Sequence, residues 1–140
     1  MIADAPFEVV DASVAVKWFI TDDEGGVAEA DRLLQRHING EVRLAAPSLL
    51  VHEVLNVLRR PSRAVPDLPE AMRALFDVGL VLVPPDCALM VRAAELVSEQ
   101  GLSTFDAAYA ALAETFQCVL VTADRGLARA AGERLETRVV

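Results

Sequence analysis

The sequence predicts an α/β fold, a three-layer α/β/α sandwich with a central, mostly parallel sheet of four or five strands. The main observation is that short runs rich in β-branched residues alternate with longer segments of helical periodicity, which is typical of βαβ units. The second observation is size, because 140 residues, 54% of them hydrophobic, are enough for one packed core. We therefore expect a single domain over residues 1–140.

The first half of the chain predicts two strands and three helices. In chain order we expect a strand over 7–11, helices over 12–19 and 24–37, a strand over 42–46 and a helix over 47–60. Asn39-Gly40 supplies the turn before the second strand. The helix is expected to begin at Pro47, because proline suits the first turn of a helix.

The second half continues the alternation after a loop marked by Pro61, Pro66 and Pro69. Beyond it we expect a helix over 70–78, a strand over 80–83, helices over 87–100 and 103–116, a strand over 119–122, a short helix from 125 and a strand over 137–140. Right-handed crossovers between parallel strands would place helices on both faces of the sheet. In such sheets, ligands bind beyond the carboxyl ends of the strands.

The composition limits the function classes. Thirteen basic and 21 acidic side chains give a net charge of −8, which argues against a protein that holds nucleic acid by overall positive charge. Cys87 and Cys118 have neither metal-site nor redox spacing, and the first residues lack the basic start of a signal peptide. No apolar run approaches the roughly 20 residues that span a bilayer. We expect a cytoplasmic protein with reduced thiols and no membrane contact.

Two aspartates stand at the predicted ends of strands. Asp11 follows an apolar strand in VVDASVAVKWF, and Asp124 does the same in VLVTADRGL. Burying an unpaired carboxylate is costly, so each residue needs a reason to be there. One reason is helix capping, because an aspartate just before a helix accepts backbone N–H bonds. For either residue taken alone, capping and a functional role explain the position equally well.

Two more acids belong to predicted helices. Asp106 follows Ser103 with the spacing of a capping box, but the rest of that helix is apolar on nearly every side and is expected to be buried. Glu53 lies at the margin of the apolar face of its helix, where a solvated charge is the simpler interpretation. His52 and Lys17 are expected on the surfaces of their helices.

The four acids together indicate a cation site. If they meet at one edge of the sheet, their mutual repulsion raises their pKa values and costs stability unless a cation neutralises them. Oxygen ligands favour Mg²⁺ or Mn²⁺. Two such ions could clamp a phosphodiester, one activating water and the other stabilising the leaving oxygen.

The chain resembles the PIN-domain ribonucleases, and within them the VapC-type toxins of bacterial toxin–antitoxin pairs. The resemblance runs in order through VVDASVAVKWF, APSLLVHEVLNVL, GLSTFDAAYAALAE and LVTADRGLARAAG. It implies that the metal-binding and catalytic acids are Asp11, Glu53, Asp106 and Asp124. It also implies that Ser13 and Thr122 are hydroxyl groups supporting these ligands, and that Asn56 is a polar neighbour of Glu53.

The resemblance further implies an activity and partners. These are hydrolysis of RNA to 5′-phosphate and 3′-hydroxyl ends, dependence on Mg²⁺ or Mn²⁺, a homodimer, and inhibition by a small cognate antitoxin. The antitoxin is expected to present a basic side chain to the acidic site and an apolar helix to a groove. The alternative is a PIN-fold binding or regulatory module whose main role is antitoxin complex formation and DNA autoregulation.

Three other classes fit the residues less well. A metal-independent ribonuclease needs a paired general acid and base, but His37 and His52 belong to different helices. A phosphoacceptor receiver domain needs a lysine at a late strand end, and Lys17 is the single lysine. A haloacid-dehalogenase-like phosphohydrolase needs a second aspartate where Ser13 stands.

Possible RNA contacts come from arginines, which suit bidentate binding of phosphate. Arg59, Arg60 and Arg63 form the densest basic cluster, and Arg125 directly follows Asp124. Arginine outnumbers lysine by 12 to 1 throughout, so for any one of these arginines composition and surface ion pairs are the favoured explanation.

Overall fold

The computed structural model describes residues 4–20, 25–132 and 134–140, and its centre is a five-stranded sheet in which every paired neighbour is parallel. The strand order is β3-β2-β1-β4-β5. The strands are β1 (Phe7–Val10), β2 (Arg43–Pro47), β3 (Val81–Val83), β4 (Leu120–Thr122) and β5 (Thr137–Val139). The predicted mostly parallel sheet is confirmed, with five strands.

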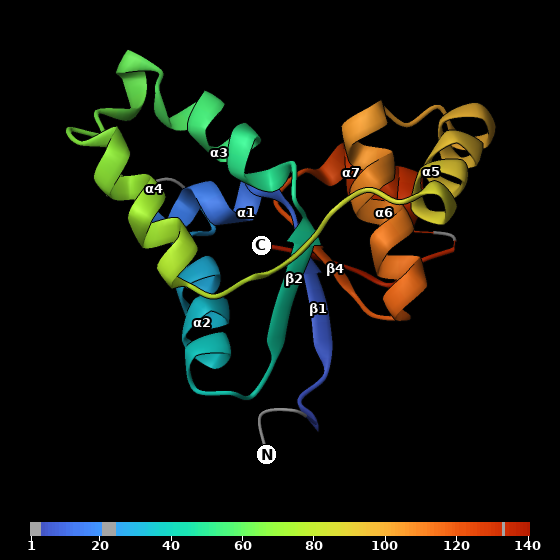
Figure 1. Cartoon of the computed structure of the whole chain (residues 1–140), viewed down its shortest axis with the longest axis horizontal. Coiled ribbons are helices and arrows are strands. Elements are labelled where there is room, and N and C mark those ends of the chain that lie inside the picture. The colour runs from blue at the N-terminus through green and yellow to red at the C-terminus, as the bar shows by residue number, and fades with distance from the viewer. Residues whose placement is uncertain (1–3, 21–24, 133) are drawn as a thin grey trace.

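Helices cover both faces of this sheet, as the three-layer prediction requires. They are α1 (Ala12–Ala15), α2 (Val27–Ile38), α3 (Leu50–Leu58), α4 (Leu68–Asp77), α5 (Cys87–Gln100), α6 (Thr104–Phe116) and α7 (Arg125–Ala131), with short 3₁₀ helices η2 (Val16–Trp18) and η3 (Pro61–Arg63). Figure 1 shows α2 and α4 on one side of the strands and α5 and α6 on the other. The α/β/α sandwich is confirmed.

The central strand is β1, which lies between β2 and β4. Val9 pairs with Ala45 on one side and with Leu120 on the other, and all three side chains are fully buried. Burial on both faces explains why these strands consist of continuous apolar runs. The chain winds from β1 toward β2 on one side and toward β4 on the other, so the switch point lies beyond the carboxyl ends of β1 and β4.

Helix α6 is enclosed, as its apolar sequence predicts. Its buried residues lie all round the helix: Ala107, Tyr109, Ala110, Ala111, Leu112 and Ala113. The small alanine side chains let the helix pack closely against α5 and the strands, as Figure 1 shows for α5. The amino end of α6 is therefore held in a fixed position beside the end of the sheet.

Two sequence-based expectations are wrong. Pro47 ends strand β2 instead of starting a helix, because the following Ser48 donates its N–H to Val83 O (2.9 Å) and prolongs the strand pairing before α3 begins at Leu50. Lys17 is 5% exposed, not a surface residue, because α2 packs against η2 and Gly25 O accepts a hydrogen bond from Lys17 Nζ (2.7 Å).

Other boundaries differ by one to three residues, which is the usual uncertainty of helix and strand ends. The predicted helix over 24–37 begins at Val27, and residue 24 lies outside the described residues. Within the described ranges, no helix is long and apolar enough to cross a bilayer.

Candidate active site

Asp11 is the most buried acid at the carboxyl edge of the sheet. It follows β1, caps α1, and is 5% exposed. Ser13 donates from its backbone N–H to Asp11 Oδ1 (3.0 Å) and also from its hydroxyl to the same oxygen. Thr122 Oγ1 donates to Asp11 Oδ2 (2.6 Å). Asp11 therefore does cap the helix, through the backbone N–H of Ser13. Capping does not explain why the hydroxyl groups of Ser13 and Thr122 also donate to it.

The two hydroxyls join the ends of β1 and β4. Ser13 Oγ accepts from the N–H of Ala123 (2.9 Å), and Thr122 Oγ1 accepts from the N–H of Asp124 (2.9 Å). Each hydroxyl therefore accepts from the β4–α7 turn while it donates to Asp11. This arrangement fixes the Asp11 carboxylate relative to Asp124, which is the geometry expected of groups that support metal ligands.

Asp124 lies on the exposed side of the same edge. Its Oδ1 accepts hydrogen bonds from the N–H groups of Gly126 (2.8 Å) and Leu127 (3.1 Å), so the residue caps α7. Asp106 is half-buried in the first turn of α6, where its backbone N–H donates to Ser103 Oγ (3.1 Å). The predicted capping role of Ser103 is confirmed.

Glu53 reaches the edge from α3 and is also half-buried. Its Oε1 accepts a hydrogen bond from the hydroxyl of Tyr109 (2.6 Å), which is 2% exposed and belongs to α6. Sequence reasoning missed Tyr109. A signal was present, because Tyr109 follows Asp106 by three residues and so lies on the same face of a helix that is otherwise apolar.

Electrostatics show which acids lie close to one another. Burial raises the pKa of Glu53, and the charges of Asp11 and Asp106 raise it further, against the Tyr109 hydrogen bond. Burial also raises the pKa of Asp106, and the charge of Asp124 adds to it. Burial raises the pKa of Asp11 despite the bonds from Ser13 and Thr122. The four predicted acids are therefore linked by pairwise repulsion, Glu53 with Asp11 and Asp106, and Asp106 with Asp124.

The four acids have no arginine or lysine partner among the described residues, unlike the buried acid at the other end of β1. There, Glu8 (6% exposed) pairs with Arg36 (3.4 Å) and also with Arg138. Buried carboxylates are normally paired or bound to a cation. The oxygen-only donor set at the carboxyl edge thus fits a hard divalent cation such as Mg²⁺ or Mn²⁺.

The acids repel one another in pairs and do not converge on a single point. In the part of the chain that the structure describes, no three His, Cys, Asp or Glu side chains are grouped so that they could hold one ion. Which of the acids bind a metal therefore stays a prediction, supported by the donor chemistry and the absence of counter-charges in the described ranges.

The remaining predicted residues belong to α3, to the segment after it and to α7. Asn56 is exposed on α3 and accepts a hydrogen bond from Arg59 Nε at its Oδ1 (3.1 Å), so this contact turns it toward the arginine cluster. Arg60 and Arg125 are exposed, and Arg63 is half-buried in η3. Their roles in binding RNA stay predictions.

The histidines do not form a catalytic pair. Leu44 N donates to His37 Nδ1 (3.1 Å), so the other ring nitrogen carries the proton and donates to Val78 O (2.8 Å). This histidine ties α2 to β2 and to the end of α4. His52 is exposed on α3, as predicted.

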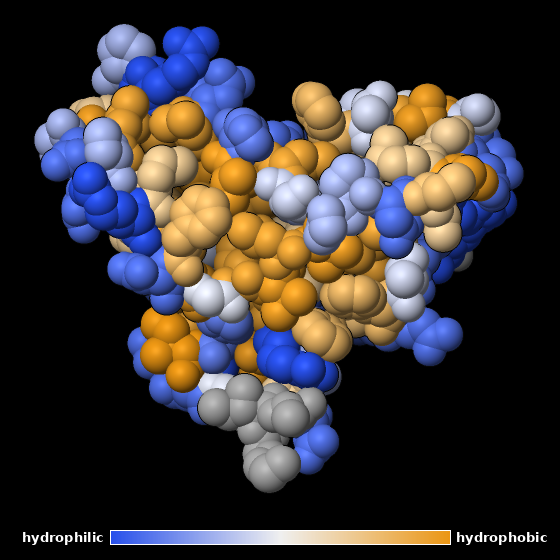
Figure 2. All heavy atoms as spheres, in the orientation of Figure 1, coloured by the Kyte–Doolittle hydropathy of each residue, from blue (hydrophilic) through white to orange (hydrophobic). Residues whose placement is uncertain are grey.

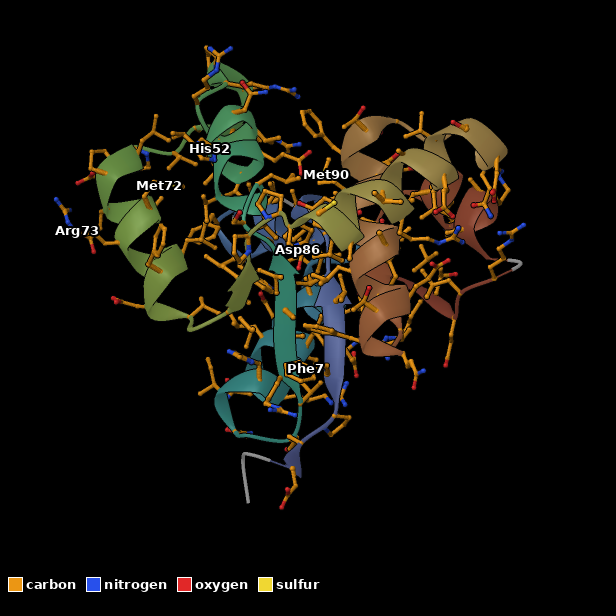
Figure 3. The ribbon with its side chains drawn as sticks, turned by 45° about the vertical axis from the view of Figure 1, so that its right-hand side comes forward. Phe7, His52, Met72, Arg73, Asp86 and Met90 are labelled. Atoms are coloured by element: carbon orange, nitrogen blue, oxygen red, sulfur yellow. The ribbon has the colours of Figure 1, made fainter. Side chains whose placement is uncertain are left out.

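The part of the sheet edge that carries Asp11, Glu53, Asp106 and Asp124 is called the acidic edge below. An apolar groove of about 710 Å³ lies next to it, since Phe105 and His52 line the groove and directly precede Asp106 and Glu53. It is lined by Pro47, Ser48, Leu49, Val51, His52, Phe76, Leu82, Val83, Pro85, Leu89, Met90, Thr104, Phe105, Ala108 and Leu112. Figure 2 shows a continuous hydrophobic surface in the hollow between the two helical layers. His52 and Met90 border it from α3 and α5 (Figure 3).

Comparisons with solved structures agree with this fold. The protein PAE2754 from Pyrobaculum aerophilum is 27% identical over 95% of this chain and 83% of its own, with a TM-score of 0.65. A toxin–antitoxin complex from Klebsiella pneumoniae (16% identity, 86% and 89% coverage) and VapBC2 from Rickettsia felis bound to a promoter DNA fragment (13%, 96% and 98%) also have TM-scores of 0.65. At these lower identities the likeness shows the fold alone.

No curated protein matches the chain. Its residues 9–133, however, match the model of the PIN domain, a span that includes the end of β1, all of β4 and the four acids. The match covers well over half of the chain. The chain therefore belongs to the PIN domain family, whose members are nucleases.

Proposed function

We propose that this chain is a metal-dependent endoribonuclease that acts as the toxin of a toxin–antitoxin pair. The observation that carries the proposal is the group of four carboxylates at the switch point of the sheet, which come from four separate segments and have no basic partner among the described residues. Four bare carboxylates would repel the phosphates of a nucleic acid, so a nuclease can use them only when cations are bound to them.

Each acid has a proposed role. Asp11, Asp106 and Asp124 hold the cations, and Glu53 completes one site and orients the attacking water. Bound Mg²⁺ or Mn²⁺ would supply Lewis-acid stabilisation of the phosphodiester and a water of lowered pKa. Ser13 and Thr122 hold the Asp11 carboxylate in place through the bonds at its two oxygens.

The substrate is proposed to be RNA, which must approach a chain of net charge −8. Two divalent ions would add four positive charges and halve that deficit. Arg59, Arg60, Arg63 and Arg125 are proposed to offer local phosphate contacts, and hydrolysis would leave 5′-phosphate and 3′-hydroxyl ends.

The antitoxin partner is supported by the apolar groove and by the similar structures, which include complexes of toxins with antitoxins. Exposed apolar patches of this kind mark interaction sites, and an amphipathic helix fits a groove between helices. Phe105 lines the groove and precedes Asp106, so a helix bound there could also extend a basic side chain to the acids. A homodimer remains part of the proposal.

The decisive experiment compares the unmodified protein with Asp11→Asn on a mixture of cellular RNAs, with Mg²⁺, with Mn²⁺ and with excess EDTA. We expect cleavage with either metal, none in EDTA, and a loss of at least about a hundredfold in Asp11→Asn. Circular dichroism should show that the variant is folded. Undiminished cleavage in EDTA or by the folded variant would contradict the proposal.

A second candidate is a PIN-fold binding or regulatory module, because VapBC2 from Rickettsia felis was solved with promoter DNA. The two functions differ when the chain is co-expressed with the product of a small neighbouring reading frame. A toxin should arrest growth alone and not with its partner. A binding module should form the complex and bind the promoter without arresting growth.

A further inference from the structure

Tyr109 occupies a central position among the four acids. It lies one turn after Asp106 on α6, is 2% exposed, and donates its hydroxyl to Glu53 Oε1 at 2.6 Å. The backbone of Ala12, the residue after Asp11, slightly lowers the pKa of the same phenol and so lies near it. One phenol group thus contacts or adjoins the segments that carry three of the acids.

The bond between Tyr109 and Glu53 crosses the site. Helices α3 and α6 stand apart above the carboxyl end of the sheet (Figure 1). Among the described residues, the bond from Tyr109 to Glu53 is the one hydrogen bond between these two helices. Glu53 is half-buried and is repelled by Asp11 and Asp106. A glutamate side chain has three rotatable bonds, so without a tether it could turn outward to solvent and relieve that repulsion.

We propose that Tyr109 is a positioning residue that holds the Glu53 carboxylate at the acidic edge, so that Glu53 can serve as a ligand of the divalent cation. This inference rests on the proposed metal-dependent function. The phenol is suited to the role because its ring is buried in α6 and its hydroxyl can donate only in the direction that the ring fixes. Its hydrogen bond occupies Oε1 and leaves Oε2 for a ligand.

The first test removes the hydroxyl and keeps the ring, in Tyr109→Phe. Mn²⁺ binding is measured by calorimetry and by the paramagnetic resonance of free Mn²⁺. We expect about a tenfold weaker affinity, which is typical when a group that orients a metal ligand is lost. Thr115→Val is the matched control, because it removes a hydroxyl that bonds Ala111 O on the same helix, away from the acids, and should bind Mn²⁺ normally.

A double-mutant cycle separates positioning from general stability. If Tyr109 acts through Glu53, then Tyr109→Phe should weaken Mn²⁺ binding in the unmodified protein and have no further effect in a Glu53→Gln background. An equal loss in both backgrounds would mean that the hydroxyl acts on the fold, and would overturn the inference.

A third measurement needs no substitution at Tyr109. This is the single tyrosine of the chain, so incorporated 3-fluorotyrosine gives one fluorine resonance. Titration with Mg²⁺ should shift that resonance in the unmodified protein and much less in Glu53→Gln. A resonance that does not move at saturating Mg²⁺ would overturn the inference, even if Tyr109→Phe fails to fold.

The outcomes distinguish this inference from the function on which it rests. If the unmodified protein binds no Mn²⁺, the metal-dependent function fails and the inference fails with it. If the unmodified protein and folded Tyr109→Phe bind Mn²⁺ equally well, the inference alone is overturned, and the nuclease function stands.

Discussion

Asp106 shows how a single residue connects stability to function. Its carboxylate is half-buried and repelled by Asp124, and both effects raise its pKa. A group whose pKa is raised by folding stabilises the protein fully below its unfolded pKa, and that contribution is lost as the pH rises through the folded value. Without a cation, the ionised acidic edge therefore weakens the fold at neutral pH.

The expected consequence is a pH-dependent gain in stability for Asp106→Asn. In EDTA, the free energy of unfolding of this variant, relative to the unmodified protein, should increase as the pH rises from about 4 to about 7, because the unmodified protein loses its contribution over that range. Urea unfolding at several pH values measures it. A difference that is constant or falls over this range would contradict the repulsion deduced for the acidic edge.

The site residues that could be predicted from the sequence are charged residues that stand in apolar surroundings. Asp11 and Asp124 stood out because each ends an apolar strand, and both lie at the sheet edge as expected. Tyr109 did not stand out, because an aromatic residue in an apolar helix satisfies hydrophobic periodicity, and its hydroxyl partner is 56 residues away. The burial of Lys17 depends likewise on a contact with Gly25, eight residues later, which helical periodicity does not reveal.

At the scale of single elements, the α7 helix depends on an acid that is also assigned to the site. Asp124 accepts two backbone N–H bonds at the start of this seven-residue helix. Asparagine can accept the same bonds without the charge, whereas alanine cannot. The structural and functional contributions of Asp124 can therefore be measured separately.

We expect Asp124→Ala to be less stable than Asp124→Asn by about 1 kcal/mol, the usual contribution of a helix cap. Both variants lose the charge that repels Asp106, so their difference isolates the cap. Both should also lose RNA cleavage, because neither provides a carboxylate. Chemical denaturation and a cleavage assay with Mg²⁺ check the two parts. Equal stabilities would mean that the cap contributes nothing to the fold.

The boundaries of elements could be predicted where local chemistry decides them. Helix α5 spans Cys87–Gln100 as expected, because Asp86 Oδ1 accepts from Leu89 N (2.8 Å) at its start and Gly101 ends it with φ +67°. The start of α3 was misplaced because Pro47 can begin a helix or end a strand. The choice depends on the N–H of Ser48 pairing with β3, more than 30 residues later, which no local pattern reveals.

At the scale of the whole molecule, strand order creates the two functional regions. Placing β1 beside β4 brings Ser13 within hydrogen-bonding distance of Ala123, 110 residues later, and forms the acidic edge. The alternating pattern predicted parallel strands but not which of them are neighbours. The apolar groove likewise combines residues from α3, α4, β3, α5 and α6, so only the folded chain shows its extent.

The groove and the acidic edge should be separable by mutation. Phe76 lines the groove from α4 and is 61% exposed, so Phe76→Glu should leave the fold intact while placing a charge in an apolar binding surface. We expect it to weaken antitoxin binding by at least about tenfold, as loss of a central aromatic contact usually does, and to leave RNA cleavage unchanged.

Ile38→Glu is the matched control, because Ile38 is 60% exposed on α2 and does not line the groove. Calorimetry with the purified antitoxin, beside the cleavage assay, measures both effects. Normal antitoxin binding by Phe76→Glu would place the partner on another surface, whereas loss of cleavage alone would mean that the groove belongs to the RNA site.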